Sequence, residues 1–147
     1  MKKLITICLL LATAFTVNAQ DMSFDETTKY IKENLIEHQF YFDGYPGCII
    51  GDIEVLKNGK VNLIFKIEAC GRKTINLFSK SNWNENKADG IVPHIYPNGR
   101  RVIAFGLTND TKDLESNDAD LVVLTRISKA FIYLRSLCKE EKDPFEN

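Results

Sequence analysis

Residues 49–67, IIGDIEVLKNGKVNLIFKI, form the stretch that decides the fold. Apolar and polar residues alternate on both sides of a short turn, Lys57-Asn58-Gly59, which is typical of a β-hairpin. We expect its strands at residues 48–56 and 60–70. An antiparallel hairpin of this kind needs one face buried, so its register is set by the apolar positions.

Two registers are possible for this hairpin. A two-residue Asn-Gly turn pairs residues whose numbers sum to 117 and would set Leu63 opposite Glu54. A three-residue loop with Gly59 in the left-handed bulge position pairs residues whose numbers sum to 116. The second register gives one continuous apolar face and is therefore the predicted one; its pairs include Val55 with Val61, Ile53 with Leu63 and Ile49 with Ile67.

Helices are predicted at both ends of this strand region. Ser23 and Glu26 form a capping box in front of an amphipathic helix over residues 24–37. A long amphipathic helix follows Ser116 or Asn117, either of which can cap it, and a short tail covers residues 143–147. Its expected buried stripe contains Leu121, Leu124, Ile127, Phe131, Leu134 and Cys138.

The remaining segments predict further short strands. These are residues 39–43, 73–78, 91–96 and 101–105, the last two joined by a Pro-Asn-Gly turn, whereas residues 106–116 are predicted as a loop. Consecutive hairpins without intervening helices favour the α+β class. We expect an antiparallel sheet or split barrel of five to seven strands, an N-terminal helix and a long C-terminal amphipathic helix.

The N-terminus has the layout of a secretory signal peptide. Lys2 and Lys3 precede an apolar run, and Val17-Asn18-Ala19 supplies small residues for cleavage. Residues 1–19 are therefore predicted to be removed, which leaves residues 20–147 as a single globular domain without a membrane span. The predicted location is periplasmic or extracellular.

Charge and composition exclude some partners. The chain of 147 residues carries a formal charge of −1, which becomes −3 once the two lysines of the leader are lost. A slightly acidic domain without a basic stripe is a poor nucleic-acid binder, because that affinity comes mainly from neutralised phosphates. No nucleic-acid partner is expected.

The cysteines give a structural hypothesis. Cys48 and Cys70 lie diagonally across the polar face of the hairpin, at about 7–8 Å between Cα atoms, just beyond the usual disulfide range. An oxidising compartment favours the bond, and distortion at the strand ends would bring them closer. We hypothesise a Cys48–Cys70 disulfide, with Cys138 free.

Catalytic and metal motifs are sparse. His38 and His94 are the only histidines, and no cysteine lies at metal-ligand spacing from another cysteine or a histidine. Asp52 and Glu54 share a strand face with lysines, which is typical of a solvated surface. No catalytic residue, metal site or cofactor is predicted, and the balance is against an enzyme.

Aromatic residues offer a binding surface. Tyr41, Tyr45 and Trp83 are the candidates, because exposed aromatic rings often anchor proteins or carbohydrates. Most aromatic residues of the chain are nevertheless expected in the core.

The helix segments carry a resemblance. The patterns Ser23-Phe24-x-Glu26-Thr27-x-x-Tyr30-Ile31 and Arg126-x-x-Lys129-Ala130-Phe131-x-x-Leu134-x-x-Leu137-Cys138, followed by Lys142-Asp143-Pro144-Phe145, resemble a group of small secreted bacterial proteins of uncharacterised function. The element order also resembles the pleckstrin-homology type of split barrel, with a helix added in front. A shared fold implies no shared function, and no catalytic or binding residue follows from the resemblance.

The sequence therefore favours an exported, non-enzymatic binding or interaction module. Its partner would be a protein, a peptide or an envelope glycan. One alternative is a small extracytoplasmic hydrolase whose cleft gathers dispersed residues such as Glu54, His94 and Tyr96. A cleft that joins His94 to a carboxylate of perturbed acidity would favour that hydrolase. Another alternative is an inhibitor of an extracellular enzyme.

Overall fold

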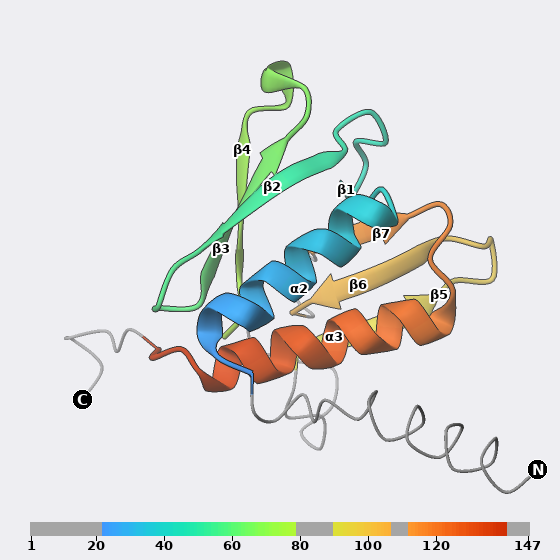
Figure 1. The fold of residues 1–147 in the computed structure, drawn as a ribbon. Helices are drawn as coiled ribbons and strands as arrows, with labels where there is room; N and C mark the ends of the chain where they lie inside the picture. Colours follow the sequence, from blue (N-terminus) through green and yellow to red (C-terminus); the bar gives the residue numbers. More distant parts are fainter. Residues whose placement is uncertain (1–21, 79–89, 107–111, 141–147) are drawn as a thin grey trace, which may run out of the picture.

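The computed structural model describes residues 22–78, 90–106 and 112–140. Within these ranges the chain forms helix α2 (Phe24–Glu37), seven strands and helix α3 (Leu121–Ser136). The predicted α+β class with an N-terminal and a C-terminal helix is confirmed (Figure 1). The strands are β1 (Tyr41–Phe42), β2 (Ile50–Val55), β3 (Lys60–Phe65), β4 (Arg72–Asn76), β5 (Ile91–Ile95), β6 (Arg101–Phe105) and β7 (Lys112–Ser116).

The strands make two antiparallel sheets. Sheet A has the order β1-β7-β6-β5, and sheet B has the order β2-β3-β4. A single bridge between Tyr41 and Ile49, together with the hydrogen bond from Ile50 N to Phe40 O (2.8 Å), connects the two sheets at β1. One core therefore extends across both sheets and both helices.

Helix α3 covers sheet A, where it contacts β5 and β6, and helix α2 lies next to α3 and packs against β2 of sheet B (Figure 1). Helix α2 begins with the predicted capping box, in which Ser23 Oγ accepts from Glu26 N and Glu26 Oε2 accepts from Ser23 N. Phe131 of α3 is fully buried and meets Phe105 of β6 edge to face, with 5.0 Å between ring centroids. The apolar stripe of α3 is thus the seam between the helix and sheet A.

The bulged register of the first hairpin is confirmed near its turn. Ile53 pairs with Leu63 and Val55 pairs with Val61, and Gly59 adopts φ +82°. A Cβ at Gly59 would also come within 2.5 Å of the Phe78 ring, so the position needs glycine for two reasons.

The predicted register is wrong at the far end of this hairpin. A bulge between Ile50 and Asp52 shifts the pairing, so Ile50 faces Phe65 and the expected pair of Ile49 with Ile67 does not form. Strand β3 ends at Phe65, and a short 3-10 helix, Glu68–Cys70, replaces the predicted strand end. The alternation of apolar residues did not predict this irregular strand end, because Ile67 continues the apolar pattern. The Ile67 side chain is nevertheless exposed.

Three predictions near the C-terminus are also wrong. Residues 112–116 form strand β7, at the C-terminal end of the segment predicted as a loop. Ser116 and Asn117 do not cap α3, since the cap is Asp120, whose side chain accepts from Val123 N (2.8 Å). Leu121 at the start of the expected stripe is exposed, whereas Leu124, Ile127 and Leu134 are buried.

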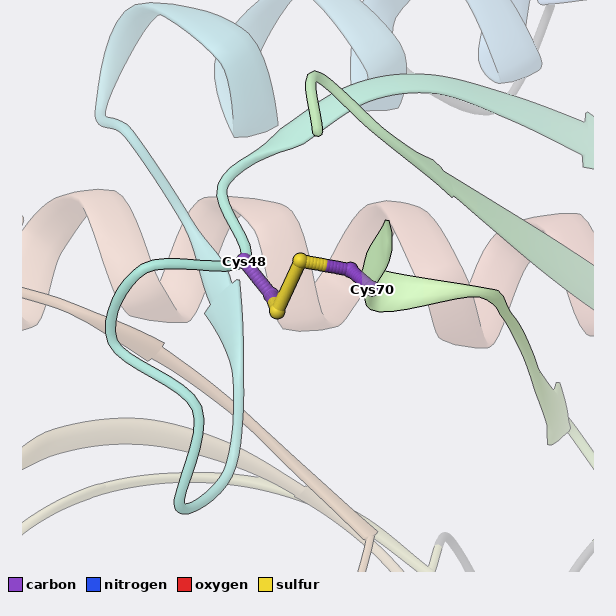
Figure 2. The surroundings of a disulfide bond; sticks show 2 residues. All are labelled: Cys48 and Cys70. Carbon is purple, nitrogen blue, oxygen red and sulfur yellow. A yellow bond between two sulfur atoms is a disulfide. The ribbon is translucent and has the colours of Figure 1, made fainter. Parts of the chain in front are cut away.

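A disulfide joins Cys48 and Cys70, with Cα atoms 5.7 Å apart (Figure 2). The bulge in β2 and the 3-10 helix provide the strand-end distortion that the hypothesis required. Cys138 is a free thiol near the end of α3. Because Ile49 bridges to β1, the bond fastens sheet B beside its connection to sheet A.

Candidate functional site

Charged side chains gather on the face of sheet A that points away from the helices. In β7, Leu114 enters the core, so the alternation of the strand sends Asp113 and Glu115 to the opposite, outer face. The register places Tyr41 of β1 beside Glu115. We call Tyr41, Asp43, Arg100, Asp113 and Glu115 the Arg100 cluster.

Arg100 holds two carboxylates of this cluster together. Its Nη2 donates to Asp43 Oδ1 (2.8 Å) and to Glu115 Oε1. The second oxygen of Glu115 accepts from the Tyr41 hydroxyl (3.1 Å). A turn positions the arginine: Gly99 has φ +86°, and Arg100 N donates to Asn98 Oδ1. The guanidinium therefore reaches across the strands from the β5–β6 turn.

The acidity of these groups differs. Burial, and a hydrogen bond shared with Glu115, raise the pKa of Asp43. Burial acts in the same direction on Glu115, but the hydrogen bonds from Arg100, Asp43 and Tyr41 outweigh it and lower the pKa of Glu115. Burial and the bond to Glu115 also raise the pKa of Tyr41. Glu115 is thus the stable anion of the cluster, and Asp43 is the carboxyl that takes up a proton more readily.

Asp113 is the exceptional member. The residue is only 3% exposed, and its Oδ1 has no hydrogen-bond partner. Burial and the nearby charge of Asp43 raise its pKa from 3.8 to about 6, although Arg100 acts against the shift. A buried carboxylate oxygen without a donor is costly, because its desolvation is not compensated.

Replacing Asp113 by asparagine should stabilise the protein at neutral pH. The raised pKa in the folded state means that wild-type stability falls as pH rises from about 4 to about 6 and stays low above that. The shift corresponds to at most roughly 3 kcal/mol, and the buried amide offsets part of it, so we expect Asp113→Asn to gain about 1–2 kcal/mol at pH 7.5 and nothing at pH 4. Urea unfolding at the two pH values measures this.

Asp52 provides the matched control. A hydrogen bond from Lys32 lowers its pKa, so Asp52→Asn should lose stability at pH 7.5 instead of gaining it. Equal gains from Asp52→Asn and Asp113→Asn would show that the effect comes from net charge and not from the buried position.

A small polar pocket adjoins the cluster. It has a volume of about 220 Å³, and its walls are Tyr41, Asn98, Gly99, Arg100, Arg101, Glu115, Ser116 and Asn117. This is below the usual size of a drug-like site and suits one side chain or one small polar group. Asp113 is not among its walls.

Two further rings extend the outer face. His94 and Tyr96 of the β5 hairpin meet edge to face, with 4.5 Å between ring centroids, and the Arg100 guanidinium lies 5.1 Å from the Tyr96 ring centroid. His94 pairs across the sheet with Val102, which in turn pairs with Glu115. The electrostatic contribution of His94 to the pKa of Asp113 is small and lowers it.

Of the aromatic residues predicted as a binding surface, the structure describes Tyr41 and Tyr45, which differ in exposure. Tyr41 is buried and presents its hydroxyl to Glu115, so its ring is not an exposed platform. Tyr45 is 53% exposed in the β1–β2 loop. Its ring stacks on that of Phe42, and the ring centroid lies 5.4 Å from Lys73 Nζ. Trp83 lies outside the described residues.

The dispersed hydrolase residues do not form one cleft. Glu54 lies in sheet B, where its carboxylate accepts from Asn62 Nδ2 (2.9 Å), whereas His94 and Tyr96 belong to the β5 hairpin of sheet A. The Glu54 face is the solvated hairpin surface that the sequence indicated.

Sequence reasoning missed four members of the cluster: Asp43, Arg100, Asp113 and Glu115. The available signal was weak, because Lys112–Ser116 contains a single apolar residue and does not show the alternation of a half-buried strand. Arg100 lies in a turn, where an arginine is ordinarily solvent-exposed.

Comparison with protein-family models, curated proteins and solved structures finds no match for this chain. The resemblance to pleckstrin-homology-type barrels and the export signal, which lies outside the described residues, stay predictions. In the part of the chain that the structure describes, no helix is long and apolar enough to cross a membrane, and no group of three or more histidine, cysteine or acidic residues could hold a metal ion.

Proposed function

We propose that the chain is an exported, non-enzymatic binding module that meets a protein or peptide on the outer face of sheet A. The disulfide supports an oxidising location, since such bonds persist mainly outside the cytoplasm. The Arg100 cluster supports the position of the surface, with a pocket beside it that can take one side chain.

The observation that carries this proposal is the burial of charge on an outer sheet face. Glu115 and Asp113 are buried there, where apolar residues would stabilise the fold at lower cost. Departures from the packing optimum concentrate at functional sites. Because the carboxylates lie on strands, the fold also holds them in fixed positions.

Retention of a partner from native envelope extract tests the proposal. The immobilised mature chain should retain one predominant polypeptide, and His94→Ala/Tyr96→Ala should reduce that retention about tenfold, as expected for loss of a contact worth about 1.4 kcal/mol. The matched control is Lys29→Ala/Glu33→Ala, which removes an exposed ion pair from α2 and should leave retention unchanged.

Two outcomes would overturn it. Equal retention by both double variants would place the binding surface elsewhere. Retention of an envelope glycan alone would replace the proposed class of partner.

A hydrolase is the second candidate, supported by one observation. Asp113, with a pKa of about 6, could exchange a proton near neutral pH, as general acids and bases do. Turnover of ester, peptide or glycoside substrates by the wild type, abolished in Asp113→Asn, would favour the enzyme over the binding module.

A further inference from the structure

We propose that Asp43 and Asp113 form a site for an organic cation, a primary ammonium or guanidinium group, on the outer face of sheet A. This inference rests on the proposed function only in its choice of surface, the outer face of sheet A. It adds the chemical class of the ligand. It starts from the charges of the Arg100 cluster, which has three carboxyl groups and one guanidinium.

Arg100 already bonds two of those carboxyl groups. Its Nη2 bonds both Asp43 and Glu115, and Tyr41 donates to the second oxygen of Glu115. Glu115 is therefore satisfied on both oxygens. Asp113 receives no hydrogen bond at Oδ1, although the charges of Asp43, Arg100 and Glu115 all act on it.

The unpartnered carboxylate oxygen, Asp113 Oδ1, is a second and independent sign of a ligand. Buried polar groups in folded proteins nearly always have a partner, so an orphaned acceptor in a charged cluster indicates a donor supplied from outside. A cation with N–H donors satisfies the charge and the hydrogen bond together. The alternative is a proton, which the raised pKa of Asp113 favours.

Access to the site is from the side of Asp43. The Asp43 side chain is 35% exposed, and its backbone N donates to Asp113 O (3.0 Å), so the two residues are direct neighbours across the β1–β7 edge. An ammonium or guanidinium entering there would bond Asp43 at the rim and Asp113 at the floor.

The chemistry of the site excludes some occupants. Among the described residues, no group of three or more histidine, cysteine or acidic residues could hold a metal ion, so the proposal names an organic cation. An anionic group is disfavoured, because three carboxyl groups face it. The same cation could come from a lysine or arginine side chain of a polypeptide, or from a small polyamine.

Binding and protonation compete for the same carboxylate. The groups that face Asp113 are Asp43 after β1, Arg100 from the β5–β6 turn, Glu115 of β7 and His94 of β5. With a pKa of about 6, Asp113 is almost fully ionised at pH 7.5 and about one-tenth ionised at pH 5. Cation binding should thus weaken about tenfold between these values, and binding near pH 6 should release a proton.

Titration of the mature chain with agmatine and with putrescine, followed by NMR and by calorimetry in two buffers of different ionisation enthalpy, tests the site. We expect saturable shifts around β1 and β7, proton release near pH 6, and affinity at least tenfold weaker in Asp113→Asn. Asp52→Asn, which removes a carboxylate of sheet B, should bind like the wild type. A short peptide with one internal arginine distinguishes the two sources of the cation: stronger binding than agmatine indicates a polypeptide, and weaker binding indicates a small molecule.

Equal affinity in Asp113→Asn and wild type, or affinity that does not weaken at pH 5, would overturn the cation site. So would the absence of saturable shifts with every probe. None of these results touches the retention experiment, in which a partner can still depend on His94 and Tyr96. Conversely, saturable cation binding without retention of any polypeptide would contradict the proposed function and support the cation site.

Discussion

Replacing Arg100 by methionine is expected to lower the free energy of unfolding by about 2–4 kcal/mol at pH 7.5. Methionine keeps much of the side-chain volume but removes the guanidinium bonded to Asp43 and Glu115. Removing one partner of a buried ion pair leaves an uncompensated charge, which costs about 3–5 kcal/mol. Arg100 is 38% exposed, so the lower part of the range is appropriate here.

The pH dependence identifies the cause. In the wild type the lowered pKa of Glu115 contributes stability above about pH 4.5, and this is lost as pH falls. In Arg100→Met the same carboxyl titrates above its unfolded value, so its ionisation destabilises the variant as pH rises. The difference between the two proteins should therefore be largest above pH 7 and shrink toward pH 4 in urea unfolding curves.

Two comparisons separate charge from packing in this experiment. Arg100→Lys should recover part of the loss, because the charge remains while the fork geometry does not. Arg126→Met, at an exposed position of α3, should change stability by about 0.5 kcal/mol or less. A loss in Arg100→Met that is the same at pH 4 and pH 7.5 would contradict the electrostatic explanation.

Removal of the disulfide is the second large effect, with an expected loss of about 3 kcal/mol in Cys48→Ser/Cys70→Ser. The bond joins residues separated by 22 positions, and cross-linking a loop of this length restricts the unfolded chain by roughly that amount. It also closes the region where the β1–β2 connection meets the end of the first hairpin (Figure 2). Guanidinium unfolding, with and without a reductant, measures the loss.

The free cysteine provides the control. Reduction should bring the wild type to the stability of the double serine variant, whereas Cys138→Ser should keep the full response to reductant. Thiol counting on the mature chain should find one thiol before reduction and three after it. Three thiols before reduction, or wild-type stability that ignores the reductant, would contradict the prediction.

Local patterns predicted the regular elements well. Ser23 and Glu26 cap α2 as expected, because a capping box uses contacts within one helical turn. The hairpin pairs Ile53 with Leu63, since both the turn and the apolar alternation specify that register. In each case the deciding interactions join residues that are near each other in the sequence.

The candidate site could not be predicted in the same way. Asp43 and Arg100 are 57 positions apart, and Tyr41 and Glu115 are 74 apart. Their meeting depends on β1 pairing with β7, a strand with one apolar residue that the alternation did not reveal. Tyr41 was expected on a surface because nothing in the sequence around it indicates that its hydroxyl donates a hydrogen bond to Glu115.

The sequence by itself determined the two helices, the first hairpin near its turn and the α+β class, since helix periodicity, caps and strand alternation act over a few residues. Only the tertiary structure decided which face of sheet A remains free of helices and which charges meet there. Long-range strand pairing sets both, because it depends on the burial of Leu114 and Phe105 in the shared core and not on any pattern around Asp113 or Arg100.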